Sequence, residues 1–234
     1  MTALIKKDFK SYFFSPLGYF FCALFALVMN LFFFIDNLSS GINNIKPLFY
    51  DMILVMSLMV PILTMRSFSE EYKLKTDQLL LTAPISTLSV VMGKFFAVLS
   101  VCMCAIAFTL PYAGIVAVLS KLPVGEIAAC YFGLVLAVSA CVSIGLFFSC
   151  ITENQIIAAS GSFAIFLVLP FMDYLYNLHN PIINGLADVL NFYMRFSSYF
   201  VSGTVRLVDV IYYLSIIAIF LFLCMRVLEK KRYN

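Results

Sequence analysis

The residues best suited to acid–base catalysis are the adjacent pair Glu70-Glu71 and a single histidine, His179. Carboxylates and imidazoles do such chemistry, or bind a metal for it, when the fold brings them together. Here the glutamates lie in a charged stretch, and the histidine stands beside Asn180 and Pro181, as expected of a solvated loop residue. No HExxH or GxSxG motif occurs either. The sequence therefore argues against an intramembrane hydrolase, and we assign no catalytic residue.

The sequence also lacks the loop that binds nucleotide triphosphates. Gly93-Lys94 is followed by Phe95, where a P-loop has serine or threonine, and no suitable glycine precedes it. Both features are needed, because the backbone amides of the loop and its lysine surround the phosphates. This chain is therefore not expected to bind a triphosphate in the usual way.

The cysteines indicate packing rather than chemistry. There are seven, an odd number, and no CxxC pair occurs, so neither a disulfide framework nor a zinc site is expected. All lie inside apolar runs, where cysteine acts as a small apolar residue. They are Cys22, Cys102, Cys104, Cys130, Cys141, Cys150 and Cys224.

Ionisable residues are absent from the middle of the apolar runs, and such residues usually mark proton or ion pathways. Asp51 and Asp173 stand at the ends of runs, where an interfacial position is the simpler interpretation. Asn30 is the main polar residue well inside a run. A hydrogen bond between helices is its expected role, worth about 0.6 kcal/mol on average. The pattern predicts no buried ionisable residue and disfavours an ion-coupled transporter.

The composition requires a membrane environment. Of the 234 residues, 63% are hydrophobic and 12% are charged, and the mean hydropathy is +1.03. Soluble domains are about 45–50% apolar and about 25% charged. A spanning helix needs roughly 20 mostly apolar residues. The chain offers six such runs in a single all-helical domain over 1–234: residues 17–35, 48–65, 95–120, 127–152, 156–172 and 210–225.

The first sixteen residues predict an amphipathic helix that lies along the membrane surface. Leu4, Ile5, Phe9, Tyr12 and Phe13 recur at near-helical spacing, with lysines between them. Pro16 and the glycine that follows would then turn the chain into the membrane.

Lysine and arginine placement predicts the orientation. One side of the predicted bundle carries eleven of the fifteen basic residues, and the other carries only Lys46, Lys121, Arg195 and Arg206. Both termini and the 66–94 loop are therefore expected in the cytoplasm of a bacterial cell, and the 173–209 segment outside it. The eleven are Lys6, Lys7, Lys10, Arg66, Lys73, Lys75, Lys94, Arg226, Lys230, Lys231 and Arg232.

The 66–94 loop is the most informative segment. Glu71 and Lys75 are four residues apart, as are Lys73 and Asp77, and this spacing favours a short helix. Three leucines, 79–81, follow, then Ala83-Pro84 breaks the helix, and Ser86 or Thr87 can cap the next one. The exposed leucines suggest a docking site for another protein, although they could equally turn back into the bilayer.

The same loop, RSFSEEYKLKTDQLLLTAPISTLSVVMGKF, resembles the first cytoplasmic loop of type-2 ABC exporter permeases. The resemblance is strongest to the subgroup with the gliding-motility and nitrous-oxide-reductase-maturation permeases. Lys75 and Gln78 depart from the family's usual glycine and glutamate. The resemblance extends to Thr152–Gln155, to GTVRLVDVIYYLSI and to the EKKRY ending. The matching positions in the loop are Arg66, Phe68, Glu70, Glu71, Thr76, Leu79, Leu80, Thr82 and Pro84.

The resemblance implies six spans, an N-terminal interfacial helix, a coupling helix between spans 2 and 3, and short external or re-entrant helices between spans 5 and 6. It implies two permease chains, identical or related, that bind separate ATPase subunits, which would hold ATP and Mg²⁺. The lipid bilayer is the other expected partner, and no nucleic acid is expected. The ATPase-docking residues would be Glu70, Glu71, Thr76, Gln78, Leu79, Leu80, Pro84, Glu153 and Gln155.

Two further alternatives stay open. A secondary transporter or channel would act without an ATPase, and a membrane anchor for a signalling ATPase would have the same docking loop. The spans are rich in Phe, Leu, Val and Ala. Spans of this composition suit a lipid-like, peptide or other hydrophobic cargo, but they also suit simple contact with lipid. A fold does not determine which cargo is transported.

Overall fold

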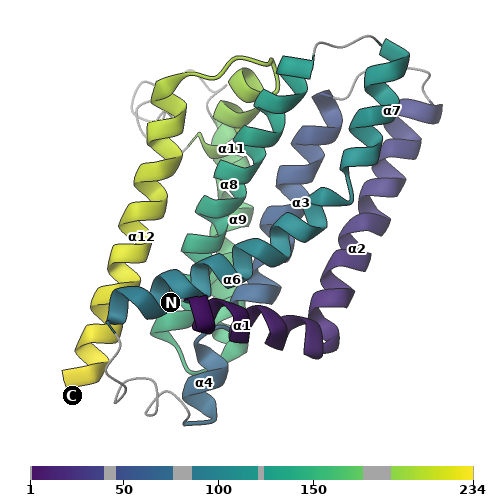
Figure 1. The fold of residues 1–234 in the computed structure, drawn as a ribbon. Coiled ribbons are helices and arrows are strands. Elements are labelled where there is room, and N and C mark those ends of the chain that lie inside the picture. The colour runs from purple at the N-terminus through teal and green to yellow at the C-terminus, as the bar shows by residue number, and fades with distance from the viewer. Residues whose placement is uncertain (1, 40–45, 76–85, 121–123, 176–190, 234) are drawn as a thin grey trace.

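The computed structural model describes residues 2–39, 46–75, 86–120, 124–175 and 191–233 (Figure 1). Within these ranges the chain is helical with short turns and contains no strand, so the predicted all-α class is confirmed. The helices are α1 (Thr2–Phe14), α2 (Pro16–Phe33), η1 (Phe34–Ser39), α3 (Lys46–Thr64), α4 (Ser69–Lys73), α6 (Thr87–Ala107), α7 (Leu110–Ser120), α8 (Val124–Ile151), α9 (Gln155–Leu175), α11 (Phe192–Arg195), η3 (Phe196–Phe200) and α12 (Leu207–Tyr233).

Five stretches of helix are long and apolar enough to cross a membrane, judged by length and composition. They overlap the predicted spans 1, 2, 3, 4 and 6. The predicted fifth span coincides with α9, whose described apolar stretch, Gln155–Phe171, is shorter. The five are Pro16–Asn37, Lys46–Lys73, Thr87–Val116, Gly125–Ile151 and Leu207–Arg232.

Helix α8 lies at the centre of the bundle and packs against α3, α6, α9, α12 and η3. Small residues let its neighbours approach closely. A Cβ atom added at Gly145 would overlap the Thr64 side chain of α3, and one added at Gly133 would overlap Phe200. Glycine at these two positions therefore sets how closely α8 meets α3 and η3.

The third predicted span differs from the expectation of one helix over 95–120. Helix α6 begins earlier, at Thr87, where the Ser86 hydroxyl accepts a hydrogen bond from the Ser89 amide and confirms the predicted cap. It ends at Ala107, and α7 resumes at Leu110. Pro111 explains the break, because proline lacks an amide hydrogen and its ring crowds the preceding turn. Figure 1 shows α6 crossing the bundle beside α1 before α7 changes direction.

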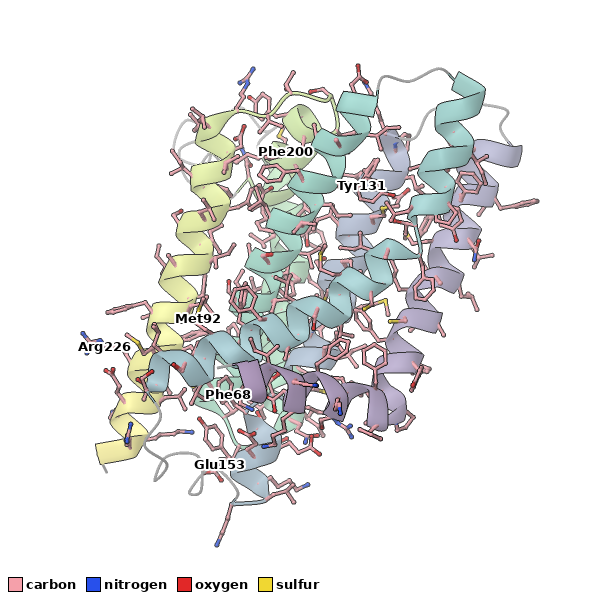
Figure 2. All side chains as sticks on the ribbon, in the orientation of Figure 1. Phe68, Met92, Tyr131, Glu153, Phe200 and Arg226 are labelled. Atoms are coloured by element: carbon pink, nitrogen blue, oxygen red, sulfur yellow. The ribbon has the colours of Figure 1, made fainter. Side chains whose placement is uncertain are left out.

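The described part of the predicted external segment packs into the bundle. Helices α11 and η3 carry Phe192, Tyr193, Phe196 and Phe200, all of which are buried. The Tyr193 hydroxyl donates to Ser57 Oγ of α3 at 2.6 Å. Phe200 lies near the upper end of the bundle in Figure 2. These aromatic side chains close the space between α3, α8 and α12 at that end.

The prediction that no ionisable residue is buried is wrong. Asp209 of α12 is 1% exposed and Lys94 of α6 is 3% exposed. Each is paired with an opposite charge, as expected for buried ions. Arg195 Nη1 donates to Asp209 Oδ1 at 3.1 Å. Asn30, in contrast, behaves as predicted, because its Oδ1 accepts a hydrogen bond from Tyr112 of α7 at 2.7 Å.

The outward faces of the helices at the edges are apolar. On α12, Val208, Ile211 and Phe222 are exposed, and on α2, Phe20 and Leu27 are exposed. Apolar surface of this extent is uncommon on soluble monomers and is expected where a protein meets lipid or a partner.

Candidate functional site

The short helix α4 projects from the end of the bundle where α1 and the C-terminus also lie (Figure 1). It belongs to the 66–94 segment that sequence analysis singled out. Residues 76–85, and with them Thr76, Gln78, Leu79, Leu80 and Pro84, lie outside the described residues. The described part of the site therefore consists of α4, the 152–155 turn and the residues of neighbouring helices that contact them.

A serine from another helix caps α4. The α4 N-cap residue, Phe68, makes no side-chain capping bond of its own. Instead, Ser149 of α8 places its Oγ 3.1 Å from the Phe68 amide and 3.3 Å from the Ser69 amide, and accepts from both. Ser69 Oγ in turn donates to the Thr152 carbonyl at 2.8 Å. This reciprocal contact fastens the start of α4 to the end of α8 and supplies acceptors for amides that a helix N-terminus leaves unpaired.

Ser149→Ala is expected to destabilise the fold by roughly 1–3 kcal/mol, because two buried backbone amides lose their shared acceptor. Thermal unfolding of the purified chain in mild detergent measures the change. Ser143→Ala is the matched control. Ser143 is also buried on α8, but its hydroxyl donates to Ala140 of the same helix. Equal melting temperatures for the two variants would contradict the cap.

The buried Lys94 joins three elements at the base of α4. Its ammonium lies 2.8 Å from Glu71 Oε1 of α4 and 3.9 Å from Asp8 Oδ2 of α1. It also donates to the Ser67 carbonyl at 2.5 Å and lies 4.9 Å from the centre of the Phe68 ring. Because Lys94 itself belongs to α6, this cluster connects α4 to both α6 and α1.

The N-terminal helix is anchored as well as amphipathic. Phe9 and Phe13 of α1 pack against the core, whereas Lys6 and Lys10 are exposed, as predicted. Tyr12 goes further than predicted, because its buried hydroxyl donates to the Leu63 carbonyl of α3 at 3.1 Å. Burial raises the pKa of the Tyr12 phenol above its ordinary value, so the hydroxyl stays protonated and remains a donor.

The C-terminal part of α12 contacts α4 from a third side. Lys231 Nζ lies 3.5 Å from the centre of the Tyr72 ring of α4. The same ammonium donates to the Cys150 carbonyl at the end of α8, at 3.3 Å. A cation over an aromatic face is worth about 0.5–1 kcal/mol at an exposed site and more when desolvated. Helix α4 is thus held by α6, α8 and α12 together.

The structure brings the two predicted docking segments to the same end of the bundle. Glu153 is exposed, and Gln155 is partly buried in the first turn of α9. Figure 2 shows Glu153 at the lower end of the bundle, near α4. The Asn154 side chain accepts from the Ile156 amide at 2.9 Å, which caps α9 and keeps the turn short. We call this surface the docking face, after the role that the resemblance predicts; its residues are Glu70, Lys73, Leu74, Lys75, Glu153 and Asn154.

The two glutamates of α4 point in different directions. The Glu70 side chain is 41% exposed and lies 3.8 Å from Arg66, so it is available at the docking face. The Glu71 side chain is 20% exposed and binds Lys94 inside the protein. The helix predicted to extend through Lys75 ends earlier, at Lys73, and Lys75 adopts a left-handed φ of 56°.

Sequence reasoning missed three residues that hold the site. The charge bias predicts Lys94 only as one of the cytoplasmic basic residues, although a lone lysine inside an otherwise apolar helix is a signal of a buried ion pair. No local pattern in the sequence predicts that Ser149 caps α4, because the two amides that it binds lie 80 and 81 residues away. Lys231 is predicted from the sequence only as one of the eleven basic residues on the cytoplasmic side.

Among the described residues, no group of three or more His, Cys, Asp or Glu side chains is placed to hold a metal ion. All seven cysteines are free, and six are buried. Comparison of the sequence with protein-family models and with curated proteins finds no match.

Proposed function

We propose that this chain is the membrane permease subunit of an ATP-driven exporter and that a separate ATPase binds the docking face. In this proposal α4 begins the coupling helix that continues into residues 76–85. Two permease chains would form the translocation path. ATP and Mg²⁺ would be held by the ATPase, and this chain would carry no catalytic residue.

The observation that carries the proposal is the way α4 is fastened. A helix that receives force from a motor must be fixed to the elements that move. Here α4 is joined to α8 through Ser149, to α6 through Lys94 and to α12 through Lys231. A nucleotide changes such a system only by binding two states of the assembly with different affinity. The contacts that fasten α4 would couple the change between these two states of the ATPase to three of the long apolar helices.

The proposal includes six spans and a cytoplasmic docking face. Helix α9 would supply the remaining span, since its described apolar stretch of 17 residues reaches the lower end of the range of about 17–25 that crosses a bilayer. The bias of basic residues toward the end that carries α1, α4 and the C-terminus supports a cytoplasmic position for that end, in the bacterial plasma membrane.

A secondary transporter is the second candidate. The sequence argument against a secondary transporter is the absence of buried charge. That argument does not hold, since Lys94 and Asp209 are buried. Both have an oppositely charged partner. A buried charge that is paired in this way has a structural role and does not by itself indicate an ion pathway. We therefore keep the ATP-driven exporter as the first candidate. Transport by the purified chain alone in liposomes with an ion gradient would reverse that order.

Co-purification tests the proposed function. A tagged chain extracted from membranes of its native host is expected to retain a separate P-loop ATPase, identified by mass spectrometry and by ATP hydrolysis in the eluate. The double variant Glu70→Gln/Glu153→Gln, on the docking face, is expected to recover less ATPase. Glu126→Gln serves as the control, because Glu126 begins α8 at the opposite end of the bundle. Recovery of no ATPase, or equal losses for both variants, would count against the proposal.

A further inference from the structure

A cavity of about 330 Å³ lies between α1, the 66–74 segment and α6. This volume is at the lower end of the range of about 300–1,000 Å³ that is typical of small-molecule sites. Such sites are mostly apolar, but the lining here carries three cations and three carboxylates, with hydroxyl groups between them. The charged residues are Lys7, Asp8, Arg66, Glu70, Glu71 and Lys94.

Two buried atoms at this cavity have unmet hydrogen-bonding capacity of opposite kinds. Asp8 Oδ2 is an acceptor and Arg66 Nε is a donor, and neither has a hydrogen-bond partner among the described residues. Their nearest opposite charges, Lys94 at 3.9 Å and Glu70 at 3.8 Å, are beyond hydrogen-bonding distance. Buried polar atoms without a partner are rare, because each costs free energy unless something pairs with it. An occupant that accepts from Arg66 and donates to Asp8 would satisfy both.

An occupant that forms a charge-assisted hydrogen bond with each of these two charged groups is a zwitterion that carries an oxyanion and an N–H cation. A simple anion would leave Asp8 unpaired, and a simple cation would leave Arg66 unpaired. Arginine binds phosphate oxygens well, since its planar group presents several donors. The Ser15 hydroxyl, 3.4 Å from Arg66 Nη1, lies on the same side of the cavity. A primary ammonium can donate to Asp8, whereas a quaternary ammonium has no N–H.

We propose that this cavity binds the phosphoethanolamine group of a membrane phospholipid. The location supports a lipid as its source, because α1 is the amphipathic helix beside the apolar bundle, and such helices lie at the level of the lipid headgroups. The acyl chains would extend along the apolar outer surface. This site does not depend on the binding of an ATPase.

The test compares lipids that differ only in their headgroup. The purified full-length chain in mild detergent is titrated with phosphatidylethanolamine, phosphatidylcholine or phosphatidylglycerol of identical acyl chains, and binding is measured by native mass spectrometry and by the melting temperature. Phosphatidylethanolamine is expected to bind at least about tenfold more tightly than the other two lipids. Neither of them has an ammonium N–H, so neither can form the charge-assisted hydrogen bond to Asp8. Soluble glycerophosphoethanolamine, which has no acyl chains, separates a lipid from a free metabolite.

The variants locate the site. Asp8→Asn and Arg66→Gln are each expected to abolish the preference for phosphatidylethanolamine. Arg226→Gln is expected to keep it, because Arg226 is an exposed arginine on α12, away from the cavity (Figure 2). Equal affinity for the three lipids, or a preference that survives in both cavity variants, would overturn the proposal. Equal affinity for the soluble compound and the lipid would overturn the assignment to a lipid.

Discussion

Lys94→Met is expected to lower the free energy of unfolding by about 3 kcal/mol, because it leaves two partly buried carboxylates without their cation. Glu71 lies 2.8 Å from the Lys94 ammonium, and Asp8 lies 3.9 Å from it. The Ser67 carbonyl loses its donor at the same time. Thermal or denaturant unfolding in mild detergent measures the loss. Because α4 is then attached less firmly to α6, we also expect ATP-dependent transport to fall more than membrane insertion does.

The control and the rescue decide whether the charge or the packing matters. Lys10→Met, on the exposed face of α1, is expected to change stability by less than about 0.5 kcal/mol. Adding Glu71→Gln and Asp8→Asn to Lys94→Met removes the unpaired charges and is expected to recover much of the stability, since neutral replacements of a whole buried ion cluster are often tolerated. A single variant as stable as the native chain would contradict the role we assign to Lys94.

Leu79→Asp or Leu80→Asp is expected to uncouple ATP hydrolysis from transport while leaving membrane insertion intact. This follows from the proposed function, in which the leucines sit in an apolar pocket of the ATPase. A carboxylate placed there must be desolvated without a partner. Loss of a central anchor typically costs 2 kcal/mol or more, so the ATPase is expected to bind about thirtyfold more weakly or worse. Affinity measurements and transport assays in reconstituted vesicles report the two effects separately.

Leu80→Met is the matched control for these variants. Methionine keeps an apolar side chain of similar volume, and such exchanges are usually tolerated. The chain with Leu80→Met is therefore expected to retain both ATPase binding and transport. Normal transport by both aspartate variants would show that the leucines are not the docking contact. Glu70 and Glu153 of the docking face would then be the remaining candidates for that contact.

Much of the architecture could be predicted from the sequence, because it follows from local patterns. Charge-free apolar runs form the long helices, since a run without charges can be buried or exposed to lipid over its whole length. The lysines of α1 alternate with Phe9 and Phe13, and this spacing alone predicts an amphipathic helix. The cap at Ser86 follows from its place before an apolar helix. The helix boundaries do not follow from the apolar runs alone, since α6 begins eight residues before the apolar run that starts at Phe95.

Taken alone, the sequence determined the helical class, the apolar runs and the amphipathic start. Only the tertiary structure decided which polar groups meet. Glu71 pairs with Lys94 of another helix, and α4 ends before Lys75. Ser149 caps a helix 80 residues away, and Arg195 meets Asp209 where α11 packs into the bundle. The physical reason is that hydropathy and helical spacing act over one or two turns, whereas a buried charge is stabilised by whatever partner the packing of distant helices places beside it.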